Sequence, residues 1–127
     1  MRLLVDTSVL IDVLRFKNGR REFLGQAVRA GHILSTTTLN IAELYAGMRP
    51  AEEAATEALL RSLELYELGG PAARLAGKLK NTWARKGRTL TLPDAIVAAI
   101  TIDRDCALVT DNRKDFPMPE IRLYPLP

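Results

Sequence analysis

The chain has 127 residues, of which 47% are apolar and 26% are charged. That length matches one domain with an ordinary buried core and is too short for two. The only cysteine, Cys106, excludes an intrachain disulfide, and no apolar run is long enough for a transmembrane helix. Asp6 follows the first apolar residues too closely for a secretion signal. We therefore expect a single domain over residues 1–127, located in the cytoplasm.

The basic residues are unevenly distributed along the chain. The 18 Lys and Arg against 15 Asp and Glu give a formal charge of +3, which is weak evidence for an anionic partner. No acid occurs between Glu67 and Asp94. We interpret this stretch either as a solvated helix face or as a surface that contacts a polyanion or a protein partner. Its basic residues are Arg74, Lys78, Lys80, Arg85, Lys86 and Arg88.

Short apolar strands and helices alternate in the first half of the chain. Residues 3–5 predict a buried strand and residues 8–14 a helix, because the spacing of the apolar side chains changes between them. A second helix over 19–30 ends before a glycine, a brief strand covers 33–35, and a third helix runs over 39–48.

The second half continues the alternation. An amphipathic helix over 50–63 and a short strand over 65–68 precede a long basic helix over 71–86. Residues 91–93 have the form of a helix entry, and 95–102 is so apolar that we expect this helix to be buried on most sides. Strands are predicted at 107–109 and, at an edge, 121–124. The pattern predicts an α/β sandwich with a mainly parallel sheet.

Two of the predicted strands end in an aspartate. Asp6 follows residues 3–5, and Asp111 follows the strand at 107–109 and Thr110. Ligands of open parallel sheets bind beyond the carboxyl ends of the strands, so both aspartates are candidate site residues. Each also has a structural explanation, since Asp6 could cap the following helix and Asp111 could form an Asx-turn.

Glu43 lies in a helix that is apolar around nearly its whole circumference, with only Asn40 and Gly47 on the same wedge. This pattern predicts a buried helix. A carboxylate there has to be paired, bound to a metal or open to a water-filled cleft, because burying an unpaired charge is costly. An ion pair with an arginine, or a capping box with Asn40, is the alternative explanation.

Asp94 lies in the first turn of the most apolar helix, where the helix dipole alone would favour a carboxylate. Together, however, Asp6, Glu43, Asp94 and Asp111 can form one cluster whose mutual repulsion divalent cations would neutralise. Oxygen ligands suit Mg²⁺ or Mn²⁺, and such a site activates water for phosphodiester hydrolysis. We interpret these four acids as candidate catalytic residues and metal ligands.

The other reactive side chains favour no different chemistry. His32 is the only histidine and lacks the partners of a zinc site or of a Ser-His pair. Cys106 precedes a strand and is predicted to lie in the core. No P-loop and no dinucleotide-binding glycine motif occurs.

Four segments in order, residues 4–12, 39–47, 92–99 and 108–116, contain the candidate acids. Together they resemble the motifs of the PIN-domain VapC toxins of toxin-antitoxin systems, and they span almost the whole chain. The resemblance implies a three-layer α/β/α fold and Mg²⁺- or Mn²⁺-dependent endoribonuclease activity. It also implies a homodimer and inhibition by a VapB-like antitoxin that inserts a segment into the active-site groove.

Asp6, Glu43 and Asp94 match the acids of that family directly. The fourth acid varies among members, and this chain has both Asp111 and Asp115. We prefer Asp111, because it leaves the strand end directly, and expect Asp115 to fix its loop by accepting backbone N–H bonds. The residues expected to orient the carboxylates are Thr7, Ser8, Thr110, Asn112 and Asp115. Those expected to contact the RNA backbone are Arg74, Lys78, Arg85, Lys86 and Arg88.

Three alternatives differ in class. A phosphatase with an aspartyl nucleophile would have a second aspartate two residues after the first, where this chain has Ser8. A structure-specific DNA nuclease shares the acid cluster but generally needs a longer chain. A non-catalytic RNA-binding PIN module is the main alternative that is not an enzyme.

Overall fold

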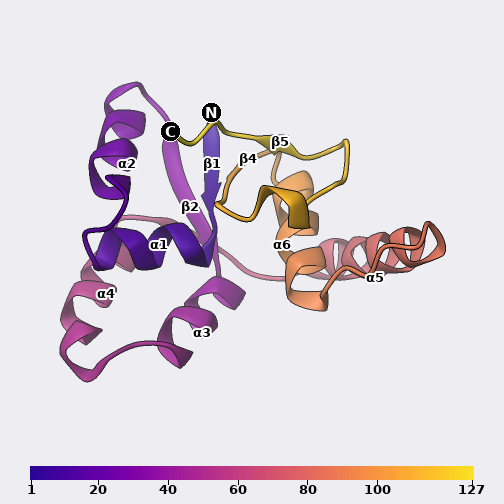
Figure 1. Cartoon of the computed structure of the whole chain (residues 1–127), viewed down its shortest axis with the longest axis horizontal. Helices are drawn as coiled ribbons and strands as arrows, with labels where there is room; N and C mark the ends of the chain where they lie inside the picture. Colours follow the sequence, from indigo (N-terminus) through magenta and orange to yellow (C-terminus); the bar gives the residue numbers. More distant parts are fainter.

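Five parallel strands form the centre of the computed structural model, which describes residues 1–127 (Figure 1). The strand order is β3-β2-β1-β4-β5, so β1 lies in the middle with Leu4 opposite Ser35 of β2 and Leu108 of β4. Because every pair is parallel, all carboxyl ends lie at one edge of the sheet. The strands are β1 (Arg2–Val5), β2 (Ile33–Thr37), β3 (Glu64–Tyr66), β4 (Ala107–Val109) and β5 (Arg122–Leu123).

Helices cover both faces of the sheet (Figure 1). One layer contains α1 (Thr7–Leu14), α2 (Arg20–Arg29), α3 (Thr38–Ala46) and α4 (Glu53–Arg61), and the other contains α5 (Gly70–Arg85) and α6 (Leu92–Asp103). Two 3-10 turns, η1 (Pro50–Glu52) and η2 (Arg113–Asp115), complete the chain. No helix is both long and apolar enough to cross a membrane. The expected three-layer α/β/α fold is confirmed.

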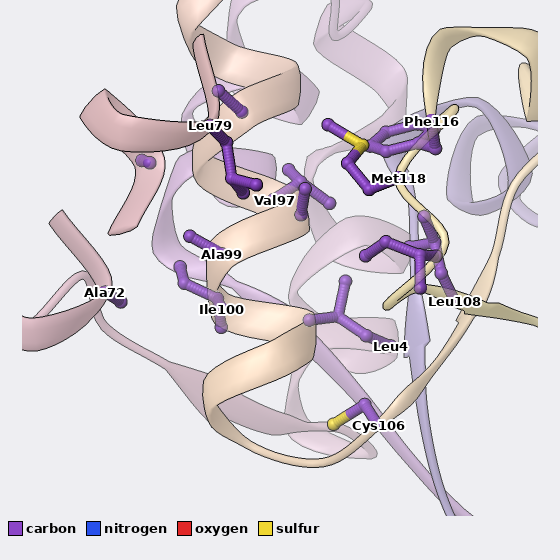
Figure 2. Packing of buried hydrophobic residues seen from close by; sticks show 14 of the residues in the cluster. Leu4, Ala72, Leu79, Val97, Ala99, Ile100, Cys106, Leu108, Phe116 and Met118 are labelled. Atoms are coloured by element: carbon purple, nitrogen blue, oxygen red, sulfur yellow. The ribbon is translucent and has the colours of Figure 1, made fainter. Parts of the chain in front are cut away.

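The core is divided into two halves by the sheet. Leu3 and Val5 of β1 pack against the α1 layer, whereas Leu4 between them faces the α5 layer. Figure 2 shows Leu4 and Leu108 packed against α6, near Val97. Residues 3–5 of β1 and all of β4 are apolar and buried, because helices cover both faces of the sheet there. Cys106 is buried in the α5 half, as predicted.

The prediction that the helix around Glu43 is buried on nearly all sides is wrong. Only Asn40 and Leu44 of α3 are buried, while Ala42 and Tyr45 are exposed. The apolar pattern was misleading because α3 lies at the carboxyl edge of the sheet and contacts only β2 and α1 extensively. The helix after residue 91 behaves as predicted, since six of the 12 residues of α6 are buried.

Candidate active site

Asp6 is the residue at which β1 passes into α1. Its backbone N–H donates to the Val109 carbonyl at 2.9 Å, which ties it to β4. Its carboxylate accepts hydrogen bonds from the Thr7 backbone N–H at 2.9 Å, the Thr110 hydroxyl at 2.8 Å and the Asn40 amide at 3.3 Å. Asp6 therefore caps α1 and is also anchored from three segments of the chain.

Asn40 is a site residue that the sequence analysis missed. It is fully buried, and its amide nitrogen donates to Asp6 and, at 2.8 Å, to the Thr7 hydroxyl. Its amide oxygen accepts from the backbone N–H of Thr37 at 3.2 Å and from the Thr37 hydroxyl at 2.7 Å. The capping box of α3 thus joins Thr37 to Asn40 and leaves Glu43 free. A threonine three residues before Asn40 was the available signal.

Glu43 is exposed on the open side of α3. Its carboxylate accepts a 2.7 Å hydrogen bond from the Thr7 hydroxyl, which in turn accepts from Asn40. No cationic side chain pairs with Glu43. Of the alternatives weighed from the sequence, the arginine pair and the capping box with Asn40 are excluded, and the Glu43 carboxylate is exposed to solvent.

The electrostatics join Asp6, Glu43 and Asp94 into one group. Burial is the main cause that raises the pKa of Asp6, hydrogen bonds from Thr110 and Thr7 lower that pKa, and the charge of Glu43 raises it further. Asp94 is half-buried in the first turn of α6, and burial again is the main cause that raises its pKa. The charges of Asp115 and Asp6 add to the rise in the pKa of Asp94. Such mutual repulsion is what a bound cation would relieve.

Asp111 and Asp115 have different surroundings in the structure. Asp111 forms an ion pair with Arg20 of α2 at 2.7 Å, so its carboxylate is already neutralised. Asp115 accepts none of the backbone hydrogen bonds expected of it, and its charge acts on Asp94 instead. The η2 turn causes this difference, because it folds the chain back after the strand end and carries Asp115 toward α6.

The supporting polar residues fall into two groups. The hydroxyls of Thr7 and Thr110 donate to the acids as expected, to Glu43 and Asp6 respectively. Asn112 contributes only its backbone N–H, which donates to the Thr110 hydroxyl at 3.0 Å. The Ser8 hydroxyl is buried and has no partner within the chain, so the hydrogen bond expected from it is not present.

The basic residues of the acid-free stretch lie along α5 and in the turn that follows it. Arg74, Lys78, Arg85, Lys86 and Arg88 are all exposed, and none of them pairs with an acid. Lys86 lies over the ring of Trp83. Arg88 donates to the Lys114 carbonyl in the η2 turn, and this bond connects the end of the basic stretch to the loop that carries Asp115.

The oxygen atoms of these acids are the kind of ligand that a hard divalent cation prefers. Asp6, Glu43, Asp94 and Asp115 offer only oxygen ligands; the charge of Glu43 raises the pKa of Asp6, and the charges of Asp115 and Asp6 raise the pKa of Asp94. No three His, Cys, Asp or Glu side chains are close enough to surround an ion by themselves. Mg²⁺ commonly keeps several waters and binds through one or two carboxylates, so a complete protein shell is not required.

A model of the PIN domain family matches residues 3–118. Relatives match over most of their length as well. Ribonuclease VapC19 of Mycobacterium tuberculosis is 30% identical over 115 residues, covering 91% of this chain and 92% of the relative. Ribonuclease VapC10 of the same organism is 35% identical over 116 residues, covering 91% and 86%. The chain therefore belongs to the PIN domain family, and within that family to the VapC group.

Solved structures share the fold. One chain of the VapBC2 complex from Rickettsia felis, bound to promoter DNA, superposes with a TM-score of 0.87 at 19% identity and covers 98% of both chains. A chain of the DNA-bound VapBC from Salmonella typhimurium gives 0.83 at 24% identity, covering 98% of this chain and 97% of that one. The resemblance inferred from the sequence motifs is thereby confirmed at the level of family and fold.

Proposed function

We propose that the protein is an endoribonuclease that hydrolyses RNA phosphodiester bonds with Mg²⁺ or Mn²⁺, as the toxin of a toxin-antitoxin pair. One observation carries the proposal. Three hydrogen bonds hold Asp6 at the carboxyl edge of the sheet, where the charge of Glu43 acts on Asp6 and the charge of Asp6 acts on Asp94. Relatives named as ribonucleases, at 30% and 35% identity, support the reaction class.

Each acid has a separate task in this proposal. Asp6 is held in place by its three hydrogen bonds and would provide a ligand of fixed position, whereas the exposed Glu43 and half-buried Asp94 can adjust to an ion and its waters. When bound, the cation would activate water and stabilise the leaving oxygen. We propose Asp115 as the fourth acid in place of Asp111, because Arg20 already neutralises Asp111.

A cleavage assay on single-stranded RNA tests the proposal. Wild-type protein should cleave RNA with Mg²⁺ or Mn²⁺ and lose activity in a chelator, and Asp94→Asn should be inactive. Asp103→Asn is a matched control, because Asp103 is exposed at the opposite end of the same helix. RNA binding without cleavage would favour the non-catalytic module, and cleavage of DNA alone would favour a DNA nuclease.

We also propose a VapB-like antitoxin as partner, because the similar structures include VapBC complexes. An apolar groove of about 450 Å³ lies between α1, α2 and α4, with Leu24, Val28, Leu34 and Leu59 in its lining. An amphipathic segment is the kind of ligand that such a groove accepts. Coexpression with a VapB-like antitoxin should give a complex that does not cleave RNA, and Val28→Glu should weaken that complex and restore cleavage.

A homodimer remains a prediction from the family resemblance. Light scattering coupled to size-exclusion chromatography should give twice the 14.1 kDa mass of the chain. A single 14.1 kDa species at micromolar protein would contradict it.

A further inference from the structure

The turn after α1 contains a phenylalanine in a backbone conformation that favours glycine. Phe16 has a φ of 55°, in the left-handed region. Its N–H donates to the Val13 carbonyl at 3.4 Å, and the N–H of Lys17 donates to the Asp12 carbonyl at 2.8 Å. This is a Schellman motif, and Phe16 has the position at which most such helices have glycine. The local backbone thus does not explain why a bulky residue is present.

Burial does not explain it either. Phe16 is 75% exposed, more than any other large apolar side chain of the protein. Its only aromatic-specific contact is with Arg21, whose guanidinium carbon lies 4.0 Å from the ring centroid. Arg21 also donates to the Val13 carbonyl at 3.4 Å, and this bond holds the guanidinium beside the turn. The Phe16 ring is therefore exposed to solvent and held beside Arg21.

The surroundings of the ring are mainly cationic. A shallow concavity of about 290 Å³ beside it is lined by Phe16, Lys17, Gly19, Arg20, Arg21 and Glu22. Lys17 and Arg21 have no acidic partner. Arg20 joins this turn to Asp111 at the edge where the candidate acids lie. Phe16 is ten residues from Asp6 along α1, which corresponds to about 15 Å at 1.5 Å per residue.

We infer that Phe16 and Arg21 form a stacking platform for a base of single-stranded RNA, outside the acid cluster. The inference rests on the proposed ribonuclease function and names a further substrate subsite of it. Aromatic rings beside unpaired cations bind unstacked bases and their phosphates together, in a manner tolerant of sequence. The positive side chains of Lys17 and Arg21 favour a polyanion over an apolar segment. The surface complementary to an apolar segment is the groove between α1, α2 and α4, which adjoins the concavity beside Phe16 because Arg21 lines both.

The test measures RNA binding and thermal melting on the same variants, in an Asp94→Asn background that prevents cleavage. Fluorescence anisotropy with a labelled single-stranded RNA gives the affinity. Phe16→Gly should weaken binding about 5- to 150-fold, the range expected for one stacked base. Its melting temperature should stay equal or rise, because glycine suits the backbone. A residue that served only the fold would show the opposite pattern.

Two further substitutions separate stacking from general apolar contact. Phe16→Trp should keep the affinity, and Phe16→Leu should lose it, because leucine has no π face. Leu65→Ala is the control, since Leu65 is also exposed but lies on the edge strand β3, away from this turn. In otherwise wild-type enzyme, Phe16→Gly should raise KM and leave kcat unchanged.

Equal RNA affinity for Phe16→Gly and its parent, or for Phe16→Leu and its parent, would overturn the platform. So would a loss of antitoxin binding with unchanged RNA affinity, which would assign Phe16 to the antitoxin interface. The proposed function fails separately, if wild-type protein with Mg²⁺ or Mn²⁺ does not cleave RNA. Anisotropy would still report the platform in that case, so the two failures are distinguishable.

Discussion

The side chain of Arg20 is 8% exposed and its guanidinium lies 2.7 Å from the carboxylate of Asp111. The pair connects the first turn of α2 to the loop that leaves β4. A second guanidinium nitrogen of Arg20 donates to the Pro127 carbonyl at 3.5 Å. One buried cation therefore joins three segments that are distant in the sequence.

This pair predicts different outcomes for the two late aspartates. Asp111→Asn should lower the stability by about 1–3 kcal/mol, below the cost of breaking a fully buried pair, because Asp111 is one-third exposed. Its RNA cleavage should persist. Asp115→Asn should remove cleavage and leave the melting temperature unchanged or higher. Rates and melting curves on the same preparations check both, and loss of cleavage in Asp111→Asn alone would return the fourth acid to that residue.

The raised pKa of Asp94 predicts a pH-dependent stability. The folded protein holds this proton more tightly than the unfolded chain, so the stabilisation is complete below the ordinary pKa of 3.8 and is lost as pH rises through the raised pKa. Asp94→Asn cannot ionise. Its melting temperature relative to wild type should therefore increase from acidic to neutral pH. A difference that does not vary with pH would show that the Asp94 carboxylate is not destabilised.

Divalent cations should restore the stability that the wild type loses as Asp94 ionises. Millimolar Mg²⁺ or Mn²⁺ should raise the melting temperature of the wild type at neutral pH, because a ligand of the native state stabilises it. Glu43→Gln should reduce the increase, since it removes an exposed ligand without disturbing the core. Asp103→Asn should retain it. An equal increase in wild type and Glu43→Gln would exclude Glu43 from the metal site.

A substitution at Asn40 should lower the stability in a way that depends on pH. Asn40→Asp replaces an amide that donates to Asp6 at 3.3 Å with a second buried carboxylate. The variant should be markedly less stable than wild type at neutral pH and should recover part of the difference at acidic pH, when one carboxylate of the pair is protonated. Asn40→Ala lacks this added charge, and the deficit it shows should vary less with pH.

The exposed basic residues on α5 predict a salt-dependent contact. Reversing Lys78, Arg85 and Lys86 to glutamate should weaken RNA binding and reduce the slope of log affinity against log salt by about 0.7 for each lost phosphate contact. Arg29→Glu is the control, because Arg29 is exposed on α2, in the other helical layer. Arg88 is left unchanged, because it supports the η2 turn. An unchanged slope would mean that this surface is merely solvated or contacts the antitoxin.

The sequence by itself determined the features that depend on neighbouring residues. Continuous apolar strands such as residues 3–5 indicated a sheet covered on both faces, because a strand with one wet face would alternate. The aspartate after β1 and the threonine-proline entry before Asp94 marked two helix starts at the carboxyl edge. The ordered motifs were sufficient to identify the PIN family, since they span the chain.

Only the tertiary structure decided the features that depend on distant segments. Arg20 and Asp111 are 91 residues apart, and no local pattern reveals that they meet. The η2 turn, which brings Asp115 toward Asp94, also depends on a bond from Arg88 across 26 residues. The exposure of α3 depends on what packs against it rather than on its composition. Local patterns report propensity and periodicity, whereas pairing and burial are properties of the assembled layers.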